Sequence, residues 1–132
     1  MAPDQNAALV QALYDAFAKG DVAFILSRLA NDVEWTVEGP SAIPYAGKRK
    51  GPGEVVKFFE ALGTGETGQK LTMMPPVAQG DVVACAGRYR ATVKATGKTY
   101  EAAVAHFFTV SGGKVTHLVE IMDTVPIAAA YR

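Results

Sequence analysis

Glu120 is the residue of this sequence whose surroundings best suit proton transfer. Residues 114–123 alternate as in a β-strand, so that Thr116, Leu118, Glu120 and Met122 share one face. The nearest neighbours of the carboxyl group on that face are apolar, and loss of water favours its protonated form. A carboxyl group that exchanges a proton near neutral pH can act as a general acid or base. We therefore expect Glu120 to be catalytic, with a structural carboxylate paired to Arg or Tyr as the alternative.

The other reactive side chains are few and widely separated in the sequence. Cys85 is the single cysteine, and His106 and His117 are the two histidines, so these residues cannot form a three-ligand metal cluster. Cys85 lies between two alanines, which is typical of a buried, inert thiol. The glycines of residues 47–53 lack the spacing of a phosphate-binding loop. We expect neither a metal nor a cofactor.

Composition narrows the class of protein. The chain has 132 residues, of which 49% are hydrophobic, and its 13 basic residues balance 13 acidic ones. This length and charge balance predict one domain over residues 1–132 and disfavour nucleic-acid binding. The apolar stretches are too short to cross a membrane, and the first residues lack the basic region of a signal peptide. We expect a cytoplasmic protein without a membrane or nucleic-acid partner.

The elements that would position Glu120 follow from hydrophobic periodicity. Helical spacing predicts helices over residues 6–19, from 21 or 22 to 29, and from Pro52 to about 62. Alternation predicts a strand over 33–38, and the Gly- and Pro-rich residues 39–53 indicate a loop. Four later runs, residues 71–78, 82–93, 98–110 and 114–123, are predicted strands joined by hairpin turns. Helices followed by a bent, mainly antiparallel sheet define an α+β fold.

Several short motifs, in this order, resemble the nuclear transport factor 2-like, or ketosteroid isomerase-like, superfamily, and within it the SnoaL-like proteins. They are Phe17-Ala18-Lys19-Gly20-Asp21, Leu29-Ala30-Asn31-Asp32-Val33-Glu34-Trp35, Tyr45-Ala46-Gly47, Gly51-Pro52, Thr96-Gly97-Lys98, Gly112-Gly113-Lys114-Val115 and Glu120-Ile121-Met122-Asp123-Thr124. The resemblance implies a cone-shaped α+β barrel, in which three N-terminal helices pack on a strongly curved mixed sheet around a cavity. It covers nearly the whole chain, but this fold hosts many activities.

The resemblance also implies which residues form the site. Glu120 matches the position of the functional acidic residue of the polyketide cyclases, limonene epoxide hydrolases and phenazine biosynthesis proteins, and Tyr89 would donate a hydrogen bond to a ligand carbonyl or to Glu120. Tyr45 would lie in a loop over the cavity mouth. The residues expected to line the cavity or bind the ligand are Leu13, Phe17, Trp35, Val37, Tyr45, Phe59, Leu62, Tyr89, Ala105, His106, Leu118, Glu120 and Met122.

Two better-known activities of the superfamily do not fit these residues. The tyrosine, donor aspartate and base of the ketosteroid isomerases fall on Leu13, Ala105 and Val37. The arginine and one aspartate of the limonene epoxide hydrolases fall on Gly87 and Tyr89. Neither mechanism is expected, because the groups that would stabilise developing charge or activate water are missing.

His106 is assigned to a face by strand alternation. If Ala105 matches the isomerase aspartate, then Ala103, Ala105 and Phe107 face the cavity and His106 faces outward. A β-bulge would reverse this assignment, so His106 stays a secondary site candidate. Both faces of residues 102–108 are apolar, which predicts a homodimer through the outer face of the sheet.

Three functions remain open at this level. The first is a cofactor-independent isomerase, cyclase or hydrolase that uses Glu120 on a small apolar carbonyl or polycyclic compound. The second is a non-catalytic module that binds such a molecule in the same cavity. The third is a structural dimer whose cavity is filled by its own side chains, among them Phe59, Met73, Met74 and Met122.

Overall fold

A computed structural model describes residues 3–132 of the chain. Helices α1 (Pro3–Ala18) and α2 (Val22–Ser27) come first, strands β1 (Leu29–Val37) and β2 (Gly47–Lys50) follow, and helix α3 (Pro52–Gly65) comes next. The strands β3 (Glu66–Met73), β4 (Val77–Gln79), β5 (Val82–Val93), β6 (Thr99–Ser111) and β7 (Lys114–Met122) follow, and α4 (Thr124–Ala130) comes last. The three N-terminal helices, the α+β class and the strand-rich second half are confirmed.

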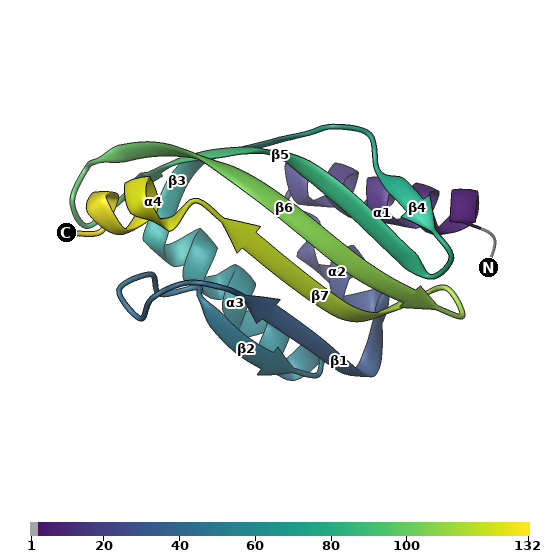
Figure 1. The fold of residues 1–132 in the computed structure, drawn as a ribbon. Coiled ribbons are helices and arrows are strands. Elements are labelled where there is room, and N and C mark those ends of the chain that lie inside the picture. Colours follow the sequence, from purple (N-terminus) through teal and green to yellow (C-terminus); the bar gives the residue numbers. More distant parts are fainter. Residues whose placement is uncertain (1–2) are drawn as a thin grey trace.

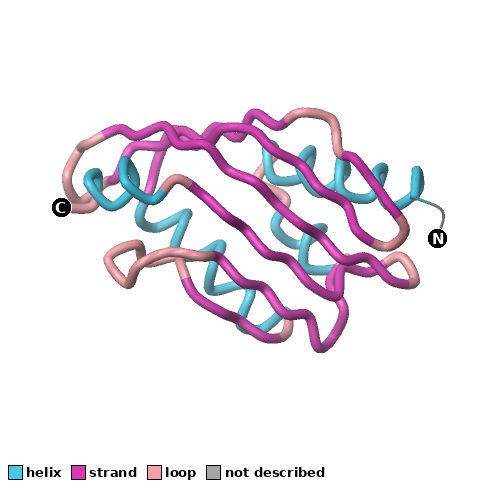
Figure 2. Tube along the Cα trace, in the orientation of Figure 1, coloured by secondary structure: helices cyan, strands magenta, loops and turns pink. Residues whose placement is uncertain are grey.

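The strands form one curved, mixed sheet that stays open at its edges (Figures 1 and 2). Their order is β2-β1-β7-β6-β5-β3, and β4 pairs with β5. β1 and β7 are parallel, whereas every other pairing in the described chain is antiparallel. The β1–β7 pairing places Trp35 beside Leu118 and Val37 beside Glu120, so two distant segments build one wall.

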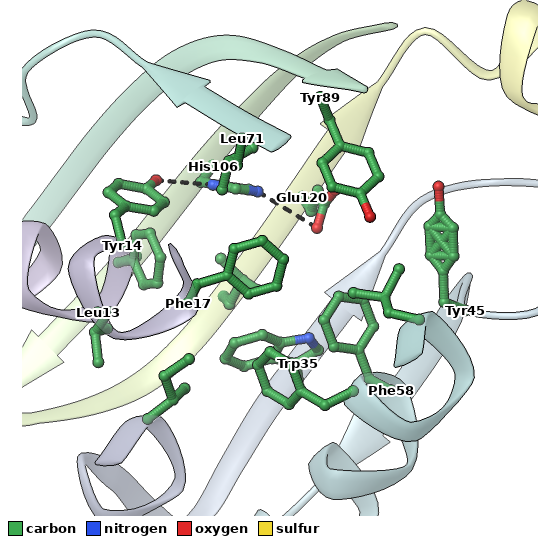
Figure 3. A pocket seen from close by; sticks show the side chains of 15 residues that line it. Leu13, Tyr14, Phe17, Trp35, Tyr45, Phe58, Leu71, Tyr89, His106 and Glu120 are labelled. Atoms are coloured by element: carbon green, nitrogen blue, oxygen red, sulfur yellow. Dashed lines mark hydrogen bonds and ion pairs between the residues drawn. The ribbon is translucent and has the colours of Figure 1, made fainter. Parts of the chain in front are cut away.

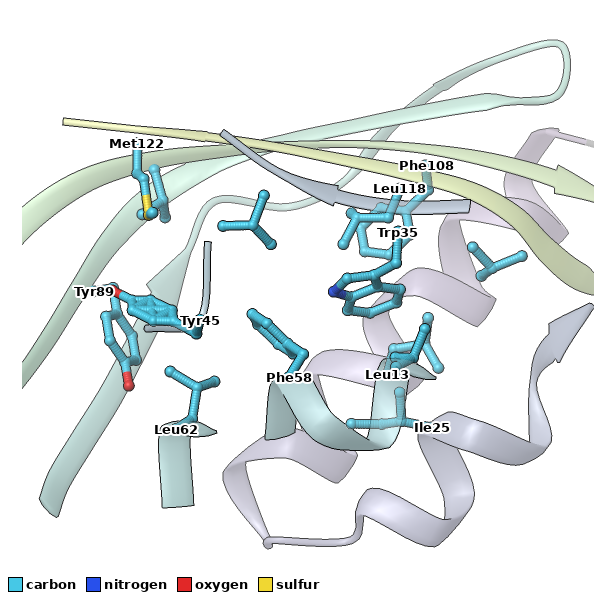
Figure 4. Close-up of a cluster of buried hydrophobic side chains, with 14 of the residues drawn as sticks. Leu13, Ile25, Trp35, Tyr45, Phe58, Leu62, Tyr89, Phe108, Leu118 and Met122 are labelled. Carbon is cyan, nitrogen blue, oxygen red and sulfur yellow. The ribbon is translucent and has the colours of Figure 1, made fainter. Parts of the chain in front are cut away.

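Helices α1, α2 and α3 cover one face of this sheet, and the core lies between the two layers (Figures 1 and 4). Trp35 of β1 packs against Phe58 and Phe59 of α3, with ring centroids 5.6 and 5.8 Å apart. Val10 and Val55 are fully buried on α1 and α3. Burying such side chains supplies the main stabilisation of a two-layer α+β fold.

The structure differs from the sequence-based expectation in three elements. Residues 47–50, expected to be loop, form β2 and pair with residues 34–37 of β1. The segment expected to be one strand over residues 71–78 belongs to two strands, because residues 74–76, which include Pro75 and Pro76, separate β3 from β4. In addition, β3 begins earlier than expected, at Glu66. Helix α4 was not expected; Asp123 caps it by accepting a hydrogen bond from the backbone N–H of Val125.

Gly87 allows β3 and β5 to pair closely. A Cβ atom at this position would lie 2.1 Å from the backbone oxygen of Thr72 and 2.6 Å from the sulfur of Met73. A side chain there must therefore push β3 away from β5, because backbone atoms cannot rotate out of contact as a flexible side chain can.

We predict that Gly87→Ala lowers the free energy of unfolding by about 1–3 kcal/mol, the usual cost of overpacking. Gly63→Ala is the matched control, because a Cβ atom at Gly63 in α3 would have no neighbour within 4 Å. Alanine favours a helix over glycine, so this control should gain up to about 1 kcal/mol. Urea denaturation of both variants measures the difference, and equal stability of the two would contradict the close pairing.

Candidate functional site

A cavity of about 70 Å³ lies between the helices and the sheet (Figure 3). Aromatic rings make up much of its wall, and the described lining residues include no lysine or arginine. The full lining is Leu13, Tyr14, Phe17, Ile25, Trp35, Tyr45, Phe58, Phe59, Leu62, Leu71, Tyr89, His106, Phe108, Leu118 and Glu120. A mostly apolar cavity with a few polar groups is typical of a small-molecule site.

Each functional side chain reaches the cavity because of its position on its element. Tyr14 and Phe17 lie three residues apart on α1, so they share a helix face. His106 and Glu120 are directly paired across the antiparallel strands β6 and β7, so they share a sheet face.

Tyr14, His106 and Glu120 form a chain of contacts along one wall (Figure 3). The Tyr14 hydroxyl lies 2.8 Å from Nδ1 of His106, and Nε2 of His106 lies 3.4 Å from a carboxylate oxygen of Glu120. The His106 and Glu120 side chains are 9% and 12% exposed, so water competes little with this contact. When Tyr14 donates to Nδ1, the neutral imidazole carries its proton on Nε2 and directs it at Glu120.

Tyr14 is suited to remain the donor at neutral pH. Burial raises the pKa of Tyr14 well above its usual range, and its neighbours Cys85 and Glu120 raise this pKa further. The phenol therefore keeps its proton and can hold the His106 ring in one orientation.

The indole N–H of Trp35 is a second polar feature of the cavity. Trp35 is 5% exposed, and within residues 3–132 no atom accepts a hydrogen bond from its Nε1. A buried donor without an acceptor costs free energy, so such groups call for an explanation. The donor belongs to a residue that lines the cavity, where a ligand oxygen could accept from it.

A buried cluster of one carboxylate and four tyrosines adjoins the cavity, and two of its tyrosines, Tyr45 and Tyr89, line it. Glu66 is 2% exposed and accepts hydrogen bonds from Tyr89 at 2.8 Å, Tyr100 at 2.5 Å and Tyr131 at 2.6 Å. The Tyr45 hydroxyl lies 2.9 Å from that of Tyr100. Burial raises the pKa of all four phenols well above the usual range, and the charge of Glu66 contributes in each case.

Most residues expected at the cavity do line it. They are Leu13, Phe17, Trp35, Tyr45, Phe59, Leu62, Tyr89, His106, Leu118 and Glu120. Val37, Ala105 and Met122 are not among the lining residues; Val37 and Met122 are buried nearby, and Ala105 lies on the outer side of the sheet. Their roles in binding, and those of the lining residues, stay predictions.

The assignment of His106 to the outer face is wrong. Along β6 the buried residues are Tyr100, Ala102, Val104, His106, Phe108 and Val110, and the residues between them are more exposed. The match of Ala105 to a cavity position is therefore out of phase by one residue, which turns every side chain to the other face.

Tyr89 and Tyr45 lie at the cavity in a different way from that expected. The Tyr89 hydroxyl donates to Glu66 and not to Glu120. Tyr45 is 2% exposed and its hydroxyl contacts Tyr100, so it forms part of the wall and does not sit over an open mouth. Cys85 is buried, donates to the backbone oxygen of Met74 at 2.8 Å, and has a pKa raised by burial, as expected for an inert thiol.

A larger groove of about 690 Å³ adjoins the cavity. The groove and the cavity share Tyr14, Phe17, Phe59, Leu62 and Leu71. The Phe17 and Phe59 rings, with centroids 6.5 Å apart, therefore border both spaces.

Tyr14, Phe58 and Glu66 contribute to the site but were not among the residues expected there. Helical spacing alone could have placed Tyr14 next to Phe17, and Phe58 one turn before Leu62. Glu66 gave no such signal, because it follows Gly63 and Gly65 in a segment expected to be irregular.

Two further observations bear on the kind of site. Among residues 3–132, no three His, Cys, Asp or Glu side chains are grouped so that they could hold a metal ion. None of the helices in that same range is long and apolar enough to cross a membrane.

The arrangement of three helices on a curved sheet around this cavity defines an NTF2-like fold. An NTF2-like protein from Burkholderia thailandensis superposes with a TM-score of 0.90 at 31% identity, covering 100% of this chain and 99% of the other. TerC, co-crystallized with polyporic acid, superposes with a TM-score of 0.85 at 27% identity over 98% of both chains.

Sequence comparison identifies the family within this fold. The SnoaL-like domain family matches residues 10–118, and the chain belongs to it. An uncharacterized protein from Mycobacterium tuberculosis is 32% identical over 123 residues, which cover 91% of this chain and 90% of that protein. The resemblance seen in the short motifs is thereby confirmed.

The contact between Tyr14 and His106 yields a stability prediction. Tyr14→Phe removes the hydroxyl and leaves Nδ1 of His106 buried without its partner, which should lower the free energy of unfolding by about 1–3 kcal/mol. Gln11→Ala is the control, because it removes an exposed hydrogen bond to Asp15 on the same helix and should cost no more than about 0.5 kcal/mol. Chemical denaturation compares the two, and an equal loss would contradict a buried, structured contact.

Proposed function

We propose that this protein binds a small, largely apolar carbonyl or polycyclic compound and acts on it as a cofactor-independent isomerase, cyclase or hydrolase. The observation that carries the proposal is the Glu120 carboxylate, 12% exposed, within an aromatic cavity and 3.4 Å from His106. A carboxylate held in this way can exchange a proton with a ligand while the aromatic wall excludes water.

The proposed chemistry is proton transfer next to a carbonyl group. Glu120 takes a proton from the carbon beside the carbonyl, and the carbonyl oxygen gains negative charge. The unpartnered N–H of Trp35 donates a hydrogen bond to this oxygen, which stabilises the charge as it develops. Glu120 then returns the proton to another atom of the ligand, while His106 keeps the carboxylate in place.

The comparisons support a small-molecule ligand. TerC, a relative at 27% identity, was crystallised with polyporic acid, a small organic molecule. The match to the SnoaL-like family over residues 10–118 includes the aromatic residues of the cavity and His106. Glu120 lies two residues beyond that match, so its role rests on the geometry.

A binding module without catalysis is the second candidate. The cavity measures about 70 Å³, whereas ligand pockets commonly measure about 300–1,000 Å³. A ligand must therefore use part of the adjoining groove or displace Phe17 and Phe59. Such a cavity can serve to bind a molecule without any proton transfer.

We predict that Glu120→Gln retains folding and ligand affinity but loses about 10²- to 10⁴-fold in turnover, the usual contribution of a positioned acid or base. Trp35, the single tryptophan, lines the cavity, so its fluorescence reports binding in both proteins. Mass spectrometry of ligand that co-purifies with the native protein selects the compound for the rate assay.

Glu101→Gln is the matched control, because Glu101 lies on β6 but is exposed and contacts Arg88 at 3.5 Å. It should change neither affinity nor rate. Unchanged turnover in Glu120→Gln would remove the acid/base role and leave the binding module. Loss of stability with unchanged affinity would indicate a structural carboxylate.

We also propose a homodimer through the outer face of the sheet. Figure 1 views the sheet from the side that α1, α2 and α3 do not cover. Phe107 on β6 and Ile121 on the neighbouring strand β7 lie there and are 44% and 50% exposed. In the pairing of these strands, Phe107 is opposite Val119 and Ile121 is opposite Ala105. Adjacent exposed apolar side chains favour burial against a second copy.

We predict that the native protein sediments at twice the chain mass and that Phe107→Glu sediments as a monomer, because a buried unpaired charge opposes association. Ala8→Glu is the control: Ala8 is exposed on α1, which covers the opposite face of the sheet, and its variant should remain dimeric. A native monomer at micromolar concentration would overturn the proposed interface.

A further inference from the structure

The hydrogen bonds of the Glu66 cluster all run in one direction, from the phenol hydroxyls towards the Glu66 carboxyl group. Three phenol hydroxyls lie within 2.8 Å of the two Glu66 oxygens, and each carries a single proton. In each of these three contacts the phenol hydroxyl donates and a carboxyl oxygen of Glu66 accepts. Tyr89, Tyr100 and Tyr131 therefore commit their protons to Glu66.

Tyr45 completes this pattern. Because the Tyr100 proton is directed at Glu66, the 2.9 Å contact between Tyr45 and Tyr100 must use the proton of Tyr45. All four phenol protons are thus consumed inside the cluster. The raised pKa values of the four tyrosines mean that none becomes a phenolate near neutral pH.

Two of the four tyrosines, Tyr45 and Tyr89, line the cavity, whereas Tyr100 and Tyr131 do not (Figures 3 and 4). The oxygens of these two residues retain lone pairs but have no proton to offer.

We infer that the cavity wall formed by Tyr45 and Tyr89 accepts hydrogen bonds and cannot donate them, so that the ligand places a donor, such as a phenolic hydroxyl, against it. The inference rests on the proposed function, since it assigns specificity to the same cavity. Glu66 is then a positioning residue, which sets this specificity without touching the ligand. Glu120 and Trp35, which line the same cavity, would meet the reacting part of the same molecule.

Glu66→Gln tests the inference, because the amide replaces one acceptor oxygen by a donor. Oε2 of Glu66 serves two tyrosines and Oε1 serves only Tyr89. The amide carbonyl should therefore occupy the Oε2 position, and its NH₂ group should donate to Tyr89. The Tyr89 proton is then released and can point into the cavity.

Three probes of similar size distinguish donors from acceptors: 2-naphthol, 2-fluoronaphthalene and 2-naphthaldehyde. Binding is followed by Trp35 fluorescence or by calorimetry. In the native protein, 2-naphthol should bind about three- to tenfold more tightly than 2-fluoronaphthalene, which corresponds to one net hydrogen bond. In Glu66→Gln, 2-naphthaldehyde should gain about three- to tenfold relative to 2-fluoronaphthalene, because Tyr89 can now donate to its oxygen.

Tyr131→Phe keeps the test decisive if Glu66→Gln does not fold. Tyr131 lies outside the cavity lining, and its loss leaves the protons of Tyr45 and Tyr89 committed as before. The preference for 2-naphthol should therefore persist in this variant, and its loss would contradict the inference. Tyr89→Phe should reduce this preference, because it removes one of the two accepting oxygens.

The outcomes separate this inference from the proposed function. Equal affinity of the native protein for 2-naphthol and 2-fluoronaphthalene overturns the inference and leaves the proposed function standing. An equal loss of affinity for all three probes in Glu66→Gln indicates a merely structural role and overturns it as well. If none of the probes binds the native protein, both proposals fail for ligands of this size.

Discussion

Burial of the Glu66 carboxylate is the interaction on which much of the rest of the structure depends. A charge that is 2% exposed is tolerated only when its oxygens are satisfied, and here three phenols satisfy them. Those phenols come from β5, from β6 and from the end of α4, and Tyr45 from the segment before β2 joins through Tyr100. The need to satisfy one charge therefore holds these four parts of the chain to β3, which carries Glu66.

Two groups of polar side chains with different properties therefore border the cavity. In the first, Nε2 of His106 contacts the Glu120 carboxylate, and Tyr14 orients the imidazole ring. In the second, Tyr89 directs its proton at Glu66 and Tyr45 directs its proton at Tyr100. Aromatic rings from β1 and α3 line the same cavity, so a flat molecule could pack against them while its polar groups meet both sets of side chains.

Much of the fold and part of the site could be predicted from the sequence, because both depend on local alternation. Leu118, Glu120 and Met122 have clear period-two spacing, and the structure places this face inward. Residues 102–108 of β6 are apolar on both faces, so the alternation of residue types does not show which face is inward. The match of Ala105 to a cavity position therefore assigned His106 to the wrong face. Glu66 could not be found in this way, since its partners lie 23 to 65 residues further along the chain.

The parallel pairing of β1 with β7 has a consequence for how the protein is made. Residues 29–37 cannot form this pairing until residues 114–122 have been synthesised. The pairing closes a very long loop, and such non-local contacts slow folding. On the ribosome, the helices and first strands, with Trp35, Phe58 and Phe59, emerge before the strands that complete the cavity wall. Until β7 arrives, the aromatic surface that later encloses the cavity is available to chaperones and to aggregation, and the nascent chain has no ligand site to protect it.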